Sequence, residues 1–245
     1  MAKAAPDGYT LLLSTRSYTI SSLLNPHFPV DLARHFAPVS LLVSIPFVLV
    51  VNPGVPANSV ADLIQLARAK PGVFNCASSG SGTVSHLGCE MLKTMAKINV
   101  VHVPYRGMGT AITDLIAGQG VQMLILATQA GLPYMKSGQL RALAVTGARR
   151  SASLPALPTV AESGFPDFEV DSWNGIHAPA GTPKPIIARL NLALVASLKL
   201  PDVRKQMLNQ GWDAVGNSPE ELAAFVTTDT ARWAKVIKDA GVRID

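Results

Sequence analysis

The chain contains few charged residues and few aromatic ones. Lys, Arg, Asp and Glu make up 15% of its 245 residues, and Phe, Trp and Tyr together make up 6%. Apolar residues account for 48%, so the composition predicts a sizeable buried core and excludes a largely disordered chain. The length suits one large domain or two small ones.

Long apolar runs and basic clusters are also missing. A membrane-spanning helix needs roughly 18 uncharged residues, and the longest candidate, residues 39–51, is shorter and contains Pro46, so it suits a buried strand. The net charge of +5 comes from scattered Lys and Arg residues that are not interleaved with aromatics. We therefore expect no nucleic-acid partner, whereas a mildly basic surface favours encounter with small acidic molecules.

Only two cysteines are present, Cys76 and Cys89, and their spacing is not that of a metal site. His86, Cys89 and Glu90 stand at helical spacing, but no second His pair or CxxC supports a metal centre, and we expect none. The two cysteines either form a disulfide or are two small buried apolar residues. The second interpretation is the favoured one.

The first residues lack the apolar segment of a signal peptide. Residues 1–9 resemble the end of a helix that stops at Pro6 and Gly8 and leads into a strand. We therefore expect that a segment which precedes this helix end is missing.

Apolar runs and turn residues alternate along the rest of the chain, which is typical of a mostly parallel, doubly wound α/β sheet. Strands are expected over residues 9–13, 36–51, 73–76, 99–105, 121–127 and 140–146, with a polar loop at 14–18. Helices are expected to begin at Ser59, after Thr83 and at Thr110, with further helices over 132–136, 185–199, 201–210 and 219–240. This order predicts two lobes, residues 1–52 plus 175–245 and residues 53–174, with a ligand cleft between them.

The most informative segment is Asn75-Cys-Ala-Ser-Ser-Gly-Ser-Gly-Thr83. We call residues 78–83 the Ser/Gly loop. Its glycines let the backbone turn tightly and expose N–H groups, and the helix that follows adds unpaired donors and the positive end of a dipole. Hydroxyls of Ser78, Ser79, Ser81 and Thr83 add further donors. The loop is predicted to bind a carboxylate or phosphate without transforming it, because it contains no lysine, metal cluster or catalytic base.

Ligands of open α/β sheets bind at the C-terminal ends of strands, where loops are expected to begin at Ser14, Ser78, Tyr105 and Thr128. His86 is expected to cap or line the Ser/Gly loop. Arg106 either binds a ligand carboxylate with its guanidinium fork or forms a surface ion pair.

Trp173, on the second strand that crosses between the lobes, either walls the cleft or packs the hinge, and the wall is the favoured interpretation.

An enzyme is the competing interpretation. Ser81 lies in Gly80-Ser-Gly82 and not in a G-x-S-x-G nucleophile elbow, and no His with an orienting acid can be placed. The sequence also lacks the GxGxxG and Walker lysine motifs of phosphate cofactor sites. We expect no catalytic residues and no cofactor. A truncated remnant that does not bind a ligand remains a third alternative.

Motifs along essentially the whole chain occur in the order found in one family. They include Ala4-Ala-Pro-Asp-Gly-Tyr-Thr-Leu-Leu-Leu13, Val103-Pro-Tyr-Arg-Gly107, Asp114-Leu-Ile-Ala-Gly-Gln119, Leu157-Pro-Thr-Val-Ala-Glu-Ser-Gly164 and Ala178-Pro-Ala-Gly-Thr-Pro183, together with the Ser/Gly loop and Ser85-His-Leu87. This set resembles the substrate-binding proteins of tripartite tricarboxylate transporters, the Bug-type receptors.

The resemblance implies a periplasmic, monomeric receptor of the two-lobed periplasmic-binding-protein type II fold, also called a flytrap. Such receptors capture small carboxylates (di- and tricarboxylates, acidic amino acids, aromatic acids) and deliver them to the membrane components of a transporter, without a cofactor. Carried over, Ser79, Ser81, Gly82 and Thr83 hold the anion, and Ser14 and Thr15 face it from the other lobe.

Two departures from the family pattern stand out. The signal peptide and the first βαβ segment are absent, so the first lobe is expected to be N-terminally truncated. The family often carries acidic residues where this chain has Gly120-Val-Gln122 and Ala127-Thr-Gln129. A ligand amino group would lose an acidic partner there, which favours plain carboxylates over acidic amino acids.

Overall fold

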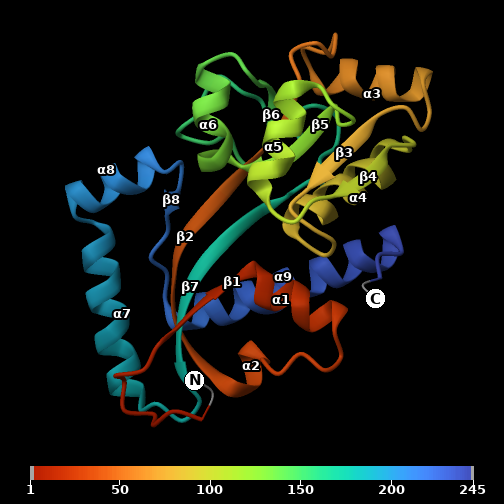
Figure 1. The fold of residues 1–245 in the computed structure, drawn as a ribbon. Coiled ribbons are helices and arrows are strands. Elements are labelled where there is room, and N and C mark those ends of the chain that lie inside the picture. The colour runs from red at the N-terminus through yellow and green to blue at the C-terminus, as the bar shows by residue number, and fades with distance from the viewer. Residues whose placement is uncertain (1–2, 244–245) are drawn as a thin grey trace. The chain divides into compact units, whose positions relative to one another are not determined.

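A computed structural model describes residues 3–243, which form two compact units. Unit 1 contains the described residues up to Ile45, Ser172–Lys235 and Arg243, and unit 2 contains Pro46–Asp171 and Val236–Val242. Two strands carry the chain from one unit to the other, β2 (Phe36–Val51) and β7 (Asp171–Pro179) (Figure 1).

The unit boundaries lie earlier in the chain than the lobe boundaries expected after residues 52 and 174. The reason is that β2 is one continuous strand whose two halves pair in different units. Val43 and Ser44 pair with β8 (Asp213–Ala214) in unit 1, whereas residues 47–51 pair with β5 (Met123–Ala127) in unit 2. Val236–Val242, expected in the first lobe, belongs to unit 2.

The sheet of unit 2 has the order β6-β2-β5-β3-β4, with β3 (Asn75–Ser78), β4 (Val101–Pro104) and β6 (Arg141–Val145). Strand β3 pairs parallel with both β4 and β5, whereas β2 runs antiparallel to β5 and β6. The sheet is thus parallel except at β2. The carboxyl ends of β3, β4 and β5 meet at one edge.

Helices alternate with these strands as the apolar periodicity predicts. They are α3 (Val60–Ala69), α4 (Val84–Ala96), α5 (Met108–Ala117) and α6 (Thr128–Lys136). The Ser59 hydroxyl caps α3 by accepting the Asp62 N–H, as expected for an N-cap serine. Side chains at alternate positions of β2 and β5 pack against α5. These residues are Val48, Val50, Leu124 and Leu126 on the strands, and Ala111, Ile112 and Leu115 on the helix.

Unit 1 combines strands from both ends of the chain. Its sheet has the order β1-β7-β2, with β8 paired to β2 and β1 at Leu12–Thr15. Its helices are α1 (Arg16–Leu24), α2 (Leu32–His35), α7 (Lys184–Leu198), α8 (Pro201–Asn209) and α9 (Pro219–Ala240) up to Lys235. Among the described residues, none of the helices is long and apolar enough to cross a membrane.

The N-terminal expectations are corrected in three places. Met1 and Ala2, part of the expected helix end, lie outside the described residues, and residues 3–11 form turns and bends without a helix. Strand β1 begins at Leu12, and Tyr9 is 94% exposed. Residues 14–18 are not a loop, because Ser14 and Thr15 pair with β7 and Arg16 begins α1.

Asp229 is a polar centre inside unit 1. Its carboxylate accepts two hydrogen bonds from the Arg16 guanidinium, at 3.1 Å from Nε and 2.9 Å from Nη2. The indole N–H of Trp173 and Nη2 of Arg232 also donate to it, each at 2.9 Å. Arg16, Trp173 and Asp229 are all buried. A buried charge needs such a partner, which explains how the polar residues after β1 form a buried helix turn.

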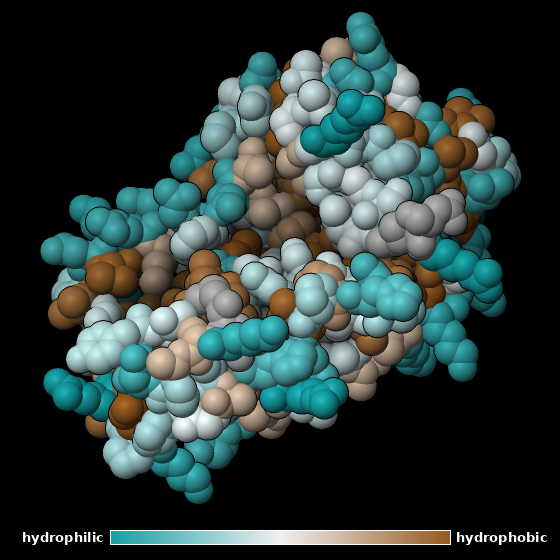
Figure 2. All heavy atoms as spheres, turned by 60° about the horizontal axis from the view of Figure 1, so that its bottom comes forward, coloured by the Kyte–Doolittle hydropathy of each residue, from teal (hydrophilic) through white to brown (hydrophobic). Residues whose placement is uncertain are grey.

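The surface carries isolated apolar residues among polar ones. Figure 2 shows hydrophobic side chains in several small groups on a face that otherwise carries many hydrophilic ones. The exposed large ones include Leu192, Leu200, Leu208 and Val215. Single exposed apolar residues are common on folded proteins and do not by themselves indicate a function.

Candidate anion-binding site

Three predicted site segments lie at the same edge of the unit 2 sheet. The Ser/Gly loop follows β3, Tyr105 and Arg106 follow β4, and Thr128 begins α6 directly after β5. Because these three strands are parallel to one another, their carboxyl ends lie side by side. The Tyr105 N–H donates to the Ser78 carbonyl at 3.0 Å and joins two of the segments.

The Ser/Gly loop turns through two glycines with positive φ, Gly80 at 138° and Gly82 at 74°. Residues with a side chain rarely adopt such φ angles, so both positions favour glycine. The Thr83 N–H donates to the Gly80 carbonyl and closes the turn. Thr83 is the N-cap of α4, since its hydroxyl accepts the His86 N–H.

Most of the loop hydroxyls hold the loop together. The Ser78 hydroxyl lies 2.6 Å from Nε2 of His102 and also bonds to Gly80, and the Thr83 hydroxyl donates to the Gly80 carbonyl at 2.7 Å. The hydroxyls of Ser79 and Ser85 are 3.2 Å apart. Ser81 differs, because it is exposed and its hydroxyl has no partner among residues 3–243.

Three backbone N–H groups in this region have no acceptor within the described part of the chain. They belong to Ser81 in the loop and to Val84 and Ser85 in the first turn of α4. We call these three N–H groups the anion seat. The α4 dipole adds a positive charge equivalent to about half a unit at the same end. An N–H without an acceptor at a helix N-terminus favours the approach of an anion.

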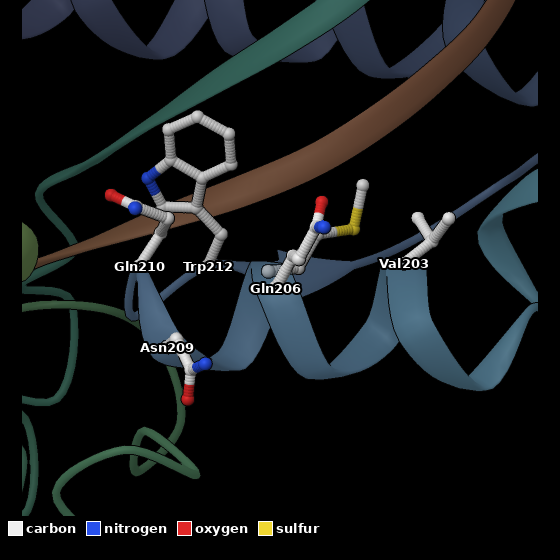
Figure 3. Close-up of a pocket in the computed structure, with 6 residues that line it drawn as sticks. Val203, Gln206, Asn209, Gln210 and Trp212 are labelled. Atoms are coloured by element: carbon white, nitrogen blue, oxygen red, sulfur yellow. The ribbon is translucent and has the colours of Figure 1, made fainter.

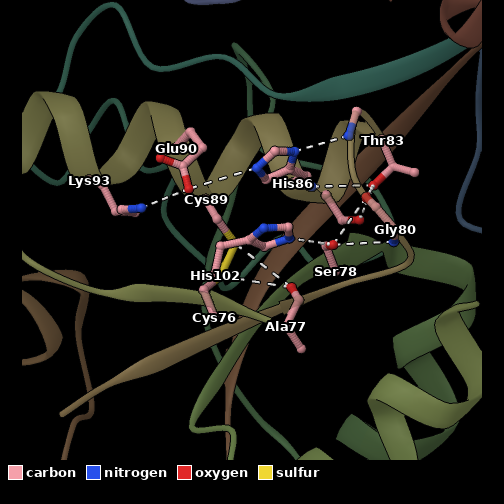
Figure 4. A network of polar contacts seen from close by, with 12 residues as sticks. Cys76, Ala77, Ser78, Gly80, Thr83, His86, Cys89, Glu90, Lys93 and His102 are labelled. Atoms are coloured by element: carbon pink, nitrogen blue, oxygen red, sulfur yellow. Dashed lines mark hydrogen bonds and ion pairs between the residues drawn. A yellow bond between two sulfur atoms is a disulfide. The ribbon is translucent and has the colours of Figure 1, made fainter. Parts of the chain in front are cut away.

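Two stacked imidazoles lie against the loop (Figure 4). The rings of His86 and His102 are parallel within 18°, with 3.8 Å between their centroids. Nδ1 of His86 accepts the Gly82 N–H at 3.0 Å. His86 therefore lines the loop, which is one of the two positions expected for it. Burial lowers the pKa of both rings, and the pKa of His102 falls to about 4, with further contributions from His86 and Lys93.

His86, Glu90 and His102 each offer one potential metal-ligand atom, and these atoms lie within 4.8 Å of one another. Their protonation does not suit a metal. Nδ1 of His86 accepts an N–H, so the neutral ring carries its proton on Nε2, the atom 3.8 Å from Glu90. The Lys93 ammonium lies 2.7 Å from the same Glu90 oxygen. These contacts favour an orienting role for the histidines over metal ligation.

The remaining predicted residues of unit 2 differ in what they can offer a ligand. The Tyr105 hydroxyl donates to Asp114 at 2.8 Å, and burial together with this carboxylate raises the pKa of Tyr105. The Thr128 hydroxyl is buried and donates to the Pro46 carbonyl. Arg106 is exposed, and among the described residues its side chain has no partner. The surface ion pair expected as one alternative for Arg106 is therefore absent from the described part.

Three predicted residues lie in unit 1, and two of them are buried. The Ser14 hydroxyl donates to the Gly175 carbonyl and lies 2.8 Å from Nδ1 of His177. Trp173 was expected to wall a cleft, but its side chain is fully buried, donates to Asp229 and packs edge-on against Phe225. Thr15 is the N-cap of α1, where its side chain makes no capping bond and is half-buried.

A hollow with a volume of about 340 Å³ lies on α8 in unit 1 (Figure 3). Val203, Gln206, Met207, Asn209, Gln210 and Trp212 line it. It contains no charged side chain and none of the predicted site residues. It therefore offers an acidic molecule no cation and is not the predicted anion site.

Cys76 and Cys89 form a disulfide that joins β3 to α4. The favoured interpretation of two separate buried thiols was wrong. His102 is not among the site residues expected from the sequence, although it directly precedes the family motif Val103-Pro-Tyr-Arg-Gly107. The spacing of Cys76 and Cys89, one on the strand and one on the next helix, was the available signal for the disulfide.

The fold of two α/β units is that of the periplasmic binding proteins. The chain belongs to the tripartite tricarboxylate transporter receptor family, whose model matches residues 1–242. This is a family of binding proteins and not of enzymes, as the sequence predicted.

Relatives agree with this assignment along nearly the whole chain. BugT of Bordetella pertussis is 37% identical over 99% of this chain, which spans 75% of that protein. A Rhodopseudomonas palustris protein solved with adipate is 36% identical with a TM-score of 0.86, over 99% of this chain and 81% of its own. MatC of the same organism, solved with malate, is 30% identical with a TM-score of 0.80, over 96% and 81%.

Proposed function

We propose that this protein binds a small di- or tricarboxylate, or an aromatic acid, at the anion seat and delivers it to the membrane components of a tripartite tricarboxylate-type transporter. The family assignment supports the transporter partner and a periplasmic location. Its relatives solved with adipate and with malate support a carboxylate as the ligand class.

The observation that carries this proposal is the set of unpaired N–H groups of Ser81, Val84 and Ser85. N–H groups at a helix N-terminus bind anions because the dipole and the free donors act together. Ser81 adds an exposed hydroxyl at the same place. No lysine, acid or free thiol lies among residues 78–85, which suits capture and release.

Arg106 supplies a second attraction for an acidic ligand. It follows β4 next to the Tyr105 carbonyl, which approaches Gly80 of the loop. Its guanidinium is exposed and has no partner in the described part of the chain. A guanidinium binds a carboxylate with two parallel hydrogen bonds. A dicarboxylate can therefore place one carboxylate on the anion seat and present the other to a cation.

A proline at position 84 tests the seat directly. Val84 is the first residue of α4, where proline is tolerated. Thr83 before it has φ −82° and ψ 164°, an extended conformation that the residue before a proline readily adopts. Val84→Pro removes one seat N–H while it keeps the helix start. Val84→Ala keeps the N–H and shortens the side chain, so it is the matched control.

Calorimetric titrations with adipate, malate, citrate, benzoate and L-glutamate measure the affinities. We expect Val84→Pro to weaken binding of the preferred acid by about tenfold or more, because a hydrogen bond to a charged group contributes about 1.5–3 kcal/mol. Val84→Ala should keep most of the affinity. Equal affinity of the proline and alanine variants would place the ligand elsewhere. A wild-type chain that melts cooperatively but binds none of the acids would support the alternative of a non-binding remnant.

A further inference from the structure

We propose that the Cys76–Cys89 disulfide is a positioning element that holds the anion seat in its binding geometry. The inference rests on the proposed function, because it concerns the same site. It assigns a role to two residues that touch no ligand and act through the backbone between them.

The disulfide encloses the Ser/Gly loop and the anion seat within a short covalent ring. Cys76 lies in β3 just before Ser78, and Cys89 lies in α4 shortly after Ser85, with a sequence separation of 13 residues. Every residue of the Ser/Gly loop and all three N–H groups of the seat lie between the two cysteines. Figure 4 shows the disulfide between the strand and the helix.

The loop needs support from outside itself. Its two positive-φ glycines, Gly80 and Gly82, allow many backbone conformations. The bonds from Thr83 to Gly80 and from Ser79 to Ser85 connect the loop to itself and to α4. These bonds do not fix α4 relative to β3. The seat donors Val84 and Ser85 belong to α4, so their position follows the position of this helix.

The contacts that do fix α4 against the sheet include the disulfide and a close approach at Gly88. A Cβ at Gly88 would lie 3.0 Å from Cγ1 of Val170 and 3.3 Å from Cδ1 of Ile125. The Cα atoms of Cys76 and Cys89 are 6.4 Å apart, so the first turns of α4 cannot move far from the end of β3. A restrained empty site loses less conformational entropy when an anion binds.

Both cysteines are buried, Cys76 at 0% and Cys89 at 1% exposure. Exchange with small thiols needs access to a sulfur, so burial protects the disulfide in the folded chain. The role that fits this burial is permanent positioning and not a redox response.

The experiment compares the oxidised chain with the double variant Cys76→Ala/Cys89→Ala. Adipate and malate are titrated calorimetrically, and amide hydrogen exchange of residues 77–88 is followed without ligand. We expect affinity to fall by about fivefold or more and exchange of these residues to accelerate by about as much, because preorganisation is lost. Leu115→Ala is the matched control. This residue is fully buried in α5 of the same unit. The control therefore lowers global stability and accelerates exchange throughout unit 2, without concentrating the effect on residues 77–88, and it keeps the affinity.

Each outcome decides between the alternatives. Two titratable thiols in the denatured, unreduced wild-type chain would overturn the proposal, as would unchanged affinity in the double variant despite faster exchange. If the wild-type chain binds neither acid, the proposed function fails for these ligands, and exchange alone decides the disulfide's role. Acceleration confined to residues 77–88 would then support positioning. An exchange pattern equal to that of Leu115→Ala would overturn it.

Discussion

The backbone N–H of Gly82 donates to Nδ1 of His86 at 3.0 Å, so a side chain of α4 holds the tip of the loop that precedes this helix. The His86 ring is in turn stacked on His102, whose Nε2 bonds to the Ser78 hydroxyl at the start of the same loop. The two imidazoles therefore connect both ends of the Ser/Gly loop through neutral rings.

Replacing His86 should destabilise this arrangement. His86→Ala leaves the half-buried Gly82 N–H without its acceptor, and the loss of a typical hydrogen bond costs about 0.5–1.5 kcal/mol. His86→Asn should cost less, because the amide oxygen can accept near the position of Nδ1. Urea unfolding gives the free energies, and amide exchange at Gly82 reports the bond itself. Equal stability and equal exchange in the two variants would show that the acceptor at this position is unimportant.

Gly88 should not tolerate even a methyl group. A Cβ there would meet Val170 at 3.0 Å and Ile125 at 3.3 Å, so α4 would have to shift from the sheet. We expect Gly88→Ala to lower the free energy of unfolding by about 1–3 kcal/mol through overpacking, although alanine favours a helix by about 1 kcal/mol.

Gly109 is the matched control for Gly88. It lies in the first turns of α5, where a Cβ would meet nothing within 4 Å. Gly109→Ala should therefore raise stability by up to about 1 kcal/mol. If both variants shift the urea midpoint in the same direction, the close approach of α4 to the sheet does not limit position 88.

Local sequence patterns predicted most of unit 2. The apolar spacing of Val60, Leu63, Ile64 and Ala67 and the cap at Ser59 need only neighbouring residues, and α3 forms where they indicate. The Ser/Gly loop and the start of α4 could also be predicted from the sequence, because glycine conformations and helix caps depend on neighbouring residues.

Contacts between distant residues explain what the sequence did not reveal. Arg16 lies in the segment expected to be a polar loop, because its partner, Asp229, is 213 positions away and nothing local indicates the pair. The same carboxylate bonds the indole of Trp173, which therefore lies in the core and not at a cleft. The sequence alone also does not show whether the hydroxyls of Ser78, Ser79 and Thr83 donate to a ligand or bond within the loop. Only packing decides which partner a hydroxyl takes.

Asp229 should be among the most sensitive positions of unit 1. Asp229→Ala removes the carboxylate that bonds Arg16, Trp173 and Arg232, and breaking a buried ion pair costs about 3–5 kcal/mol. Arg232→Ala should cost less than Asp229→Ala, because the side chain of Arg232 is 25% exposed and Asp229 keeps its bonds to Arg16 and Trp173. Urea unfolding measures both values. A small loss in Asp229→Ala, similar to that in Arg232→Ala, would mean that the buried guanidinium of Arg16 does not depend on this carboxylate.

Stability should fall in mild acid because of His177. This ring is 2% exposed, and burial lowers its pKa to about 4. The unfolded ring has an ordinary pKa of about 6.5, so between these values the unfolded chain binds more protons than the folded chain. The free energy of unfolding therefore decreases as the pH falls from about 6.5 to about 4, by up to about 1.4 kcal/mol per pH unit, and is unaffected by His177 above this window.

His177→Gln should flatten the profile of urea unfolding against pH, whereas His27→Gln, at an exposed position, should leave it unchanged. The lowered pKa of His102 acts in the same direction, so part of the slope should persist in His177→Gln. A slope that His177→Gln does not reduce would show that the His177 ring keeps an ordinary pKa in the folded chain.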